Sequence, residues 1–296
     1  MHIIGNILLC LSLETRKMDQ QLNSELPASA AAKISYCQPD DPWILRKIIF
    51  FLEIIFGSKK VFAIYEKLRR EPFEVGVFFR SAMQETKIQC HYDPDKLNKI
   101  PRQGPLVIVA NHPFGIVDGL IMCDIAARVR GNFRILINSV LCVDDDLNTH
   151  FLPVNFDQTK EAVKTNISSK KRATDDLKND IPLVIFPSGH VSTADRFGFG
   201  SVVDAPWTTF AAKLIRESNA TVIPIFFRGQ NSRLFHVASH ISMALRSALL
   251  LNEARRRFGE EVRIEIGDPI SWEKLEAFES RQELTNFLYD KVQSLQ

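Results

Sequence analysis

The feature that most constrains the fold is a series of short apolar runs, rich in β-branched and aromatic residues, that alternate with segments of helical spacing. The strand-like runs lie at 106–110, 133–138, 151–154, 182–186, 221–227 and 262–266. The helical segments between them lie at 118–130, 158–179, 205–218 and 240–257. This alternation predicts an α/β fold with a mostly parallel central sheet and crossover helices on both of its faces.

The α/β domain is predicted to span residues 88–296. Residues 88–93 are expected to form a strand that need not be central. The run VRIEI at 262–266 alternates apolar and charged side chains, which predicts an edge strand. The segment that begins at Ser271 predicts two short helices packed on the sheet. Function collects where parallel strands end and helices begin, so the turns after the strands are the places to look for a site.

The first 87 residues predict two regions that precede this domain. Residues 1–42 are expected to be a flexible segment, because 14–42 is rich in Ser, Ala, Gln and Asp and contains three prolines. The apolar start lacks a basic n-region and a small-residue cleavage site, so we expect a frayed or loosely docked terminus rather than a signal peptide.

Residues 43–87 predict an N-terminal amphipathic helical pair, broken near Gly57, followed by a further helical stretch. The pair, at 43–70, carries seven basic and two acidic residues beside large apolar side chains. This pattern suits docking on an anionic lipid surface. A pair that packs on the core with solvated Lys and Arg side chains fits the pattern equally well.

The composition narrows the classes of function. A net charge of +2 gives no argument for binding nucleic acid. Five scattered cysteines without a Cys-x-x-Cys pair argue against a disulfide framework and a zinc site, and they favour a reducing compartment. No run reaches the roughly 18 apolar residues of a membrane-spanning helix. We therefore expect any work at a membrane to be peripheral, at the cytoplasmic face of the inner membrane.

The first polar turn, NHPFGIVDG, directly follows a predicted core strand and opens a helix. His112, beside Asn111 and held by Pro113, stands where a general base should stand. Asp118, at the start of the helix, is placed to fix the tautomer of His112 and to offset the imidazolium charge. A helix-capping Asp and a histidine that only shapes the turn are the alternative interpretation.

Two later strands also end in polar turns. The turn FPSGHVS contains Ser188 and Gly189, and its backbone N–H groups are candidates to bind an oxyanion or a phosphate. Arg196 follows in the same loop. Arg228, at the end of the strand IPIFF, is a candidate clamp for a polar head group. The alternative for the FPSGHVS turn is a flexible loop of Gly and Ser without a function. The alternative for Arg228 is an ion pair with a nearby Asp.

In this order, the three turns resemble the glycerolipid acyltransferase superfamily, which includes lysophosphatidic acid acyltransferases. The matching features are Asn-His-(five residues)-Asp after a strand, Phe-Pro-x-Gly after a later strand, and an apolar strand with a central Pro224. The residue sequence of the first turn, NHPFGIVDG, most resembles the branch that includes haemolysin-like proteins and ornithine-lipid O-acyltransferases. The similarity covers roughly residues 88–236, and the basic helical pair fits the membrane-docking helices of the family.

The resemblance implies acyl transfer in membrane lipid synthesis, from a thioester of coenzyme A or acyl carrier protein directly to the hydroxyl of a lyso-lipid. His112 would take the acceptor proton, Asp118 would orient His112, and N–H groups near Gly115 and the helix start would stabilise the oxyanion. The implied partners are a lyso-lipid acceptor, the thioester carrier and a membrane surface, without a resident cofactor or metal. The expected substrate-binding residues are Asn111, Gly115, Ser188, Gly189, Arg196 and Arg228.

The sequence departs from the family pattern in two places. The family has four residues between His and Asp, whereas this chain has five, so Gly115 is expected to adopt a positive φ. The second turn usually reads Phe-Pro-Glu-Gly-Thr-Arg, but Ser188, His190 and Val191 stand at the Glu, Thr and Arg positions. The missing arginine favours an acceptor other than lysophosphatidic acid, such as a hydroxyacyl amino lipid, with Arg196 or Arg228 as a substitute.

Two alternatives to an acyltransferase remain open at this point. A serine hydrolase would use Ser188 as nucleophile with His112 or His190 as base, although the Gly-x-Ser-x-Gly elbow is missing. A non-catalytic lipid-surface module would use the basic helices, with His112 and Asp118 only shaping a turn.

Overall fold

The computed structural model describes residues 58–142, 144–157 and 159–296, and the structural statements below concern these residues. The predicted flexible segment and the first helix of the basic pair lie outside them.

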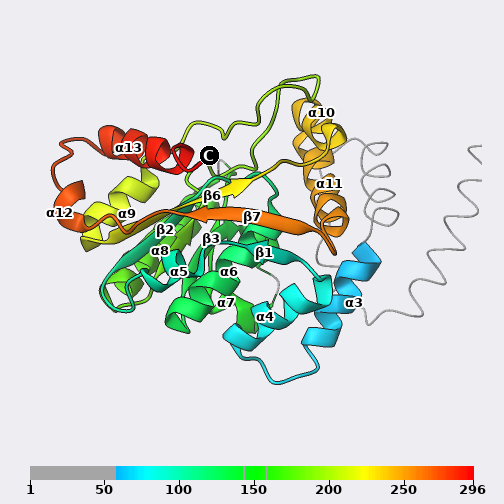
Figure 1. The fold of residues 1–296 in the computed structure, drawn as a ribbon, viewed down its shortest axis with the longest axis horizontal. Coiled ribbons are helices and arrows are strands. Elements are labelled where there is room, and N and C mark those ends of the chain that lie inside the picture. The colour runs from blue at the N-terminus through cyan, green and yellow to red at the C-terminus, as the bar shows by residue number, and fades with distance from the viewer. Residues whose placement is uncertain (1–57, 143, 158) are drawn as a thin grey trace, which may run out of the picture. The chain divides into compact units, whose positions relative to one another are not determined.

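Strands and helices alternate along the described chain (Figure 1). The strands are β1 (Gln89–His91), β2 (Leu106–Ala110), β3 (Arg134–Asn138), β4 (Phe151–Val154), β5 (Leu183–Ile185), β6 (Thr221–Arg228) and β7 (Glu261–Ile266). The longer helices are α3 (Ser58–Leu68), α4 (Val75–Thr86), α6 (Ile116–Arg130), α8 (Lys160–Lys178), α9 (Phe210–Ser218), α10 (Arg233–Ile241), α11 (Met243–Arg256) and α13 (Arg281–Gln293). The short helical segments are α5 (Pro94–Asn98), η2 (Ser139–Leu141), α7 (Asp145–Asn148) and α12 (Trp272–Leu275).

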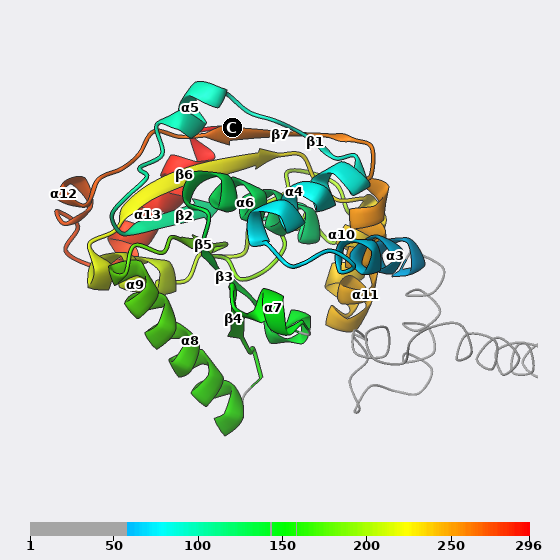
Figure 2. The same cartoon turned by 90° about the horizontal axis from the view of Figure 1, so that it is seen from below.

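The strands form one sheet in the order β1-β7-β6-β2-β5-β3-β4. Every neighbouring pair is parallel except β6 and β7, which run antiparallel. Figure 2 shows β1 and β7 toward one edge of the sheet, and β4 with α8 toward the other. The mostly parallel α/β sheet predicted from the sequence is confirmed.

The prediction that VRIEI forms an edge strand is wrong. The strand β7 lies between β1 and β6, and the three-residue β1 takes the edge. Along β7, Val262, Ile264 and Ile266 are buried, whereas Glu261 and Arg263 are exposed. The alternation therefore arises from a strand with one open face, and it carries no information on which strand is outermost.

The sheet is covered on both faces, as Figure 1 shows. On one face Ile108 and Ala110 of β2 pack with side chains of α4 and α6. On the other face Val107 and Val109 pack with side chains of α8, α9 and α13. Because β2 is buried along its whole length, it is a rigid element, and the turn that follows it has a fixed position.

The helix predicted at 240–257 is present as α11, and a separate helix, α10, that the sequence did not predict comes directly before it. The helix α10 ends at Ile241 and α11 begins at Met243, because Ser242 between them has extended dihedral angles of φ −158° and ψ 135°. The two helices pack against each other, and Figure 1 shows them together beyond the carboxyl end of β6. The two helices predicted after Ser271 are present as α12 and α13.

The second helix of the basic pair, α3, packs on the protein. It contacts α4 and α11, and the Tyr65 ring meets the Phe78 ring edge to face at 6.5 Å. Lys67 forms an ion pair with Glu85 at 2.8 Å, and Arg69 forms one with Asp144 at 3.0 Å. The contacts of α3 therefore agree with the alternative in which the basic helices pack on the protein core. Within the described ranges, no helix has both the length and the apolar character needed to cross a bilayer.

Candidate active site

The turn after β2 is fixed to the neighbouring strand β6 by Asn111. Its side-chain amide accepts a hydrogen bond from the Phe227 N–H at 2.7 Å and donates one to the Phe227 carbonyl at 3.0 Å. Asn111 is 7% exposed, so these two hydrogen bonds satisfy a buried amide. The structure thus places Asn111, expected among the substrate-binding residues, as the brace that positions the residue after it.

His112 and Asp118 lie in contact. Nδ1 of His112 is 3.1 Å from Oδ2 of Asp118. Gly115 has a φ of +78°, the positive value that the extra residue in the turn predicted. This conformation brings the turn back on itself, so that Asp118 at the third position of α6 faces the imidazole.

Asp118 is fully buried and carries several hydrogen bonds on one oxygen. Besides His112, the N–H groups of Phe114 and Gly115 donate to Oδ2 at 2.8 and 2.9 Å. Burial raises the pKa of the Asp118 carboxyl, and the hydrogen bonds from these three residues oppose the rise. The N-terminal end of α6 adds a favourable dipole for a carboxylate. The other oxygen, Oδ1, has no partner within the described residues.

These hydrogen bonds correct the expectation for the oxyanion. N–H groups near Gly115 and at the helix start were expected to stabilise it, but those of Phe114 and Gly115 both donate to Asp118. Both N–H groups therefore orient the Asp118 carboxylate. Of the N–H groups proposed near Gly115 and at the helix start, only those of the first turn of α6 are left for this role.

The His112 ring is held on its other side by an aromatic residue. The ring stacks on Phe186, the first residue after β5, with centroids 3.9 Å apart and an interplanar angle of 20°. The His112 side chain is 17% exposed, and its Nε2 forms no hydrogen bond within the described part of the chain. With Nδ1 on Asp118, the tautomer that keeps the proton on Nδ1 leaves Nε2 as an accessible proton acceptor.

The turn after β5 lies beside this pair, but its hydroxyl is not directed at the imidazole. The Ser188 Oγ–H donates to the His190 carbonyl at 2.8 Å, which closes a local turn. Gly189 has a φ of +67° and lies against the Phe156 ring. The arrangement of Ser188 therefore differs from that of a serine nucleophile, which would donate to a base.

A buried carboxylate that sequence reasoning missed joins the two turns. Oδ1 of Asp204 accepts hydrogen bonds from the His112 N–H at 3.3 Å and from the Ser192 hydroxyl, and Oδ2 accepts one from the Trp207 indole at 2.8 Å. The Ser192 N–H also donates to the His112 carbonyl at 2.8 Å. No local motif marks Asp204, because the turn that it joins to this loop lies far away in the sequence, with His112 92 residues before it.

The two arginines expected to bind substrate occupy different settings. Arg196 is exposed, and its guanidinium lies 4.8 Å from the ring centroid of Phe197. Arg228 pairs with Glu265 of β7 at 3.0 Å and donates to the Leu295 carbonyl at 3.1 Å. The paired alternative therefore describes Arg228, which joins β6 to β7 and to the C-terminal segment.

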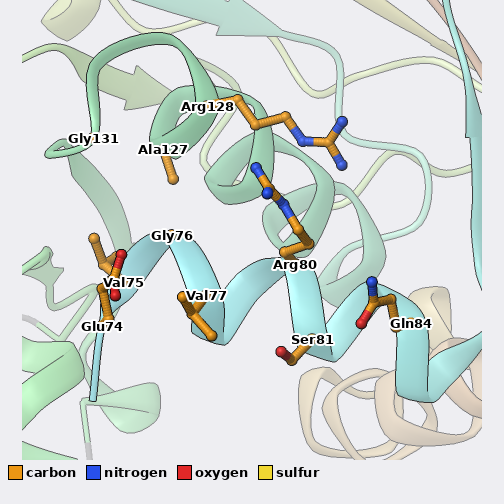
Figure 3. A pocket seen from close by; sticks show the side chains of 10 residues that line it. All are labelled: Glu74, Val75, Gly76, Val77, Arg80, Ser81, Gln84, Ala127, Arg128 and Gly131. Atoms are coloured by element: carbon orange, nitrogen blue, oxygen red, sulfur yellow. The ribbon is translucent and has the colours of Figure 1, made fainter. Parts of the chain in front are cut away.

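Two cavities of about 340 and 790 Å³ lie elsewhere, against α4 and the C-terminal half of α6. Figure 3 shows the smaller one, lined by Arg80 of α4 and by Ala127 and Arg128 of α6. At 1.5 Å per residue, Ala127 lies about 16 Å along α6 from the helix start near His112. Neither cavity includes His112 or Asp118 in its lining, so both are separate from the candidate site.

Among the described residues, no set of three or more His, Cys, Asp or Glu side chains is placed to hold a metal ion. Cys90, Cys123 and Cys142 are free thiols, and burial raises the pKa of each.

Comparison with known proteins identifies the family. A family model described as acyltransferase matches residues 73–296. A lyso-glycine lipid O-acyltransferase of Phocaeicola vulgatus is 28% identical over 264 residues, which cover 86% of this chain and 89% of the relative. A protein of the same name from Bacteroides thetaiotaomicron is 24% identical over 233 residues, or 75% of this chain and 81% of the relative. A crystal structure of the 1-acyl-sn-glycerophosphate acyltransferase of Thermotoga maritima aligns with a TM-score of 0.49 at 16% identity, over 85% of this chain and 87% of that one.

The matched region contains all three polar turns and the whole sheet, and it spans most of the chain. It confirms the superfamily that the turns predicted. The chain therefore belongs to the acyltransferase family, and the protein is an acyltransferase.

Proposed function

We propose that the protein transfers an acyl chain from a thioester to the hydroxyl of a lyso-lipid, with His112 as general base and Asp118 as the residue that orients it. The observation that carries the proposal is the 3.1 Å contact between Nδ1 of His112 and the fully buried carboxylate of Asp118, with Nε2 unbonded within the described chain. A base held by a buried carboxylate suits the proton transfer that acylation of a hydroxyl requires, and the chain belongs to an acyltransferase family.

The chemistry follows from this geometry. Nε2 of His112 takes the proton of the acceptor hydroxyl as its oxygen attacks the thioester carbonyl. Asp118 stabilises the imidazolium that forms. When the tetrahedral intermediate collapses, the C–S bond breaks and the proton on Nε2 passes to the leaving thiolate. The products are an ester and a free thiol, and the enzyme returns to its starting state. Either coenzyme A or acyl carrier protein supplies the thioester in this proposal.

The acceptor we propose is an acylated amino acid. Both relatives are named for lyso-glycine lipid, and an O-acyltransferase needs a hydroxyl that glycine lacks. The hydroxyl must then lie on the chain attached to glycine, and attachment through the glycine amine leaves a free carboxylate. This acceptor belongs to the class of hydroxyacyl amino lipids expected from the sequence, with glycine in place of the ornithine of the branch that the first turn resembles.

We also propose that the site works at the surface of a membrane, on the cytoplasmic side. Exposed aromatic side chains lie in the loops that follow β4 and β5, beside the two turns. Phe156 is 52%, Phe197 61% and Phe199 53% exposed. The guanidinium of Arg233 lies 4.0 Å from the ring centroid of Phe199. Aromatic side chains next to arginines suit an anionic bilayer surface, and they would place the site next to its lipid substrate.

The test is a transfer assay with purified full-length protein. The substrates are an acyl-coenzyme A or acyl carrier protein thioester and an N-(3-hydroxyacyl)glycine, and the readouts are the O-acylated product by mass spectrometry and the released thiol. We expect both readouts to depend on the acceptor. Thiol release that ignores the acceptor and is lost in Ser188→Ala would replace the proposal with a hydrolase, and vesicle binding without either product would replace it with a lipid-binding module.

A further inference from the structure

Arg246, on α11, is a half-buried cation without a carboxylate partner in the described part of the chain. Its guanidinium donates a hydrogen bond to the Val191 carbonyl in the turn after β5, and it lies 5.6 Å from the ring centroid of Phe235. The remaining N–H donors of the guanidinium have no protein acceptor among the described residues. A guanidinium removed from water without an anion is costly, which makes this side chain different from the paired Arg228.

Arg246 lies on the face of α11 that covers the turn containing His112. Leu250 follows it by four residues and therefore projects from the same face of the helix. A Cβ atom added to Gly115 would lie 2.9 Å from Cδ2 of Leu250 and 3.1 Å from Cγ2 of Val191. Leu250 and Val191 thus both lie against Gly115, in the turn after β2. Val191 is also the residue whose carbonyl accepts the hydrogen bond from Arg246. The backbone of Arg246 is one helical turn from that of Leu250, and its guanidinium reaches the Val191 carbonyl.

The charge of Arg246 also reaches His190, in the turn after β5. The pKa of His190 is lowered by partial burial, by the positive charge of Arg246 and by that of His112. Arg246 is therefore within electrostatic range of the same imidazole as His112. Burial lowers the pKa of the Arg246 guanidinium as well, so its surroundings disfavour the cation unless an anion is present.

We propose that Arg246 binds the carboxylate of the acceptor's amino-acid head and thereby holds the acceptor hydroxyl beside Nε2 of His112. This assignment rests on the proposed function and names the residue that selects its substrate class. A guanidinium can take a carboxylate through two parallel N–H donors, which fixes orientation as well as position. The turn after β5 has Val191 at the position where the superfamily pattern that it resembles has an arginine, and it would then receive its cation from α11.

The decisive experiment compares two acceptors on two proteins. The acceptors are N-(3-hydroxyacyl)glycine and its glycinamide counterpart, which keeps the hydroxyl and loses the charge. We expect the wild-type protein to prefer the acid by about 10- to 100-fold in kcat/KM, as for hydrogen bonds to a charged group. In Arg246→Gln the preference for the acid should be lost, so that kcat/KM for the acid falls to within about threefold of kcat/KM for the amide in the same variant.

Controls separate binding from folding. Arg256→Ala removes an exposed arginine from the same helix and should keep the wild-type preference, whereas Arg246→Lys should show an intermediate one. If Arg246→Gln does not fold, Arg246→Lys decides the question, and an unchanged preference in it overturns the assignment. A wild-type protein that acylates acid and amide equally also overturns it and leaves the proposed function standing. Transfer to neither acceptor would overturn both.

Discussion

The two turns that meet at the candidate site, residues 111–119 after β2 and 186–192 after β5, use their histidines differently. His112 has Nδ1 on the buried carboxylate of Asp118, which stabilises the charge that arrives with a proton. His190 has no ion pair within the described residues, and the charges of Arg246 and His112 help to lower its pKa. An accessible histidine after a core strand is therefore a candidate general base when a carboxylate contacts its other ring nitrogen, as Asp118 does at His112.

The largest effect that would sharpen this comparison is expected at the carboxylate. Asp118→Asn keeps the shape of the side chain and removes its charge, so the imidazolium loses its partner. We expect kcat to fall about 10³-fold, within the range that general base catalysis supplies. The counterpart in the other turn is Ser188→Ala, which removes a hydroxyl bonded to its own turn. It should change kcat by less than about threefold. Equal losses in the two variants, measured in the acyl-transfer assay, would remove the distinction between the turns.

A second pair of variants tests how each turn is held in shape. Gly115→Ala and Gly189→Ala place an alanine at φ +78° and +67°, so both carry a backbone cost of about 1 to 2 kcal/mol. Only the first puts a Cβ atom 2.9 Å from Leu250, whereas the second meets Phe156 at an ordinary 3.5 Å. We expect Gly115→Ala to lower the free energy of unfolding by about 1 to 3 kcal/mol more, as overpacking does. It should also lower kcat. Urea unfolding curves for the two proteins decide this, and identical midpoints would show that the turn after β2 is not tightly packed.

The segment after the second turn provides a smaller, pH-dependent effect. The Ala194 N–H donates to Nδ1 of His236 at 3.3 Å, so this buried imidazole must stay neutral there. Burial mainly lowers the pKa of His236; Arg246 and His240 lower it further, and Asn231 and Glu253 oppose them.

Because the unfolded chain then binds a proton more readily, stability is complete above the ordinary pKa of 6.5 and is lost as pH falls below it. The loss is at most about 1.4 kcal/mol per pH unit for one proton. His236→Gln should reduce the difference between the free energies of unfolding in urea at pH 7.5 and pH 5.5. A variant that loses as much stability at pH 5.5 as the wild type would show that His236 is not the source of the acid sensitivity.

The smallest effect is expected at the histidine of the second turn. His190→Gln leaves the contact between His112 and Asp118 intact, because His190 takes no part in it. We expect kcat to change by less than about threefold, since no general base is removed. A loss comparable with that of Asp118→Asn in parallel assays would make His190 part of the proton-transfer machinery and would end the comparison.

Much of the fold and part of the site follow from local sequence patterns. Strands such as β2 are continuous runs of β-branched residues, and their alternate residues contribute to the two cores, so their bounds can be predicted to within two residues. The positive φ of Gly115 is also predictable, because an extra residue between His112 and Asp118 has to be absorbed by the only glycine between them.

The rest depends on contacts between distant segments. Asp204 joins the two turns from another loop, and Arg246 resembles any basic residue in an amphipathic helix. The break at Ser242 has neither Gly nor Pro to mark it. The place of β7 in the sheet depends on the short β1 that pairs with its outer edge. No local pattern reveals the links of Asp204 to His112, of Arg246 to Val191 and of β7 to β1, because each joins residues far apart in the chain.

The most direct test of the central claim, that His112 takes the proton of the acceptor, is the rate of ester formation by purified His112→Ala. The account predicts a fall of about 10³-fold or more, since the variant has no base at that position. Its thermal unfolding midpoint should stay within a few degrees of the wild type, because the side chain is partly exposed and lies outside the hydrophobic core. A folded His112→Ala protein that forms the ester within tenfold of the wild-type rate would contradict the account.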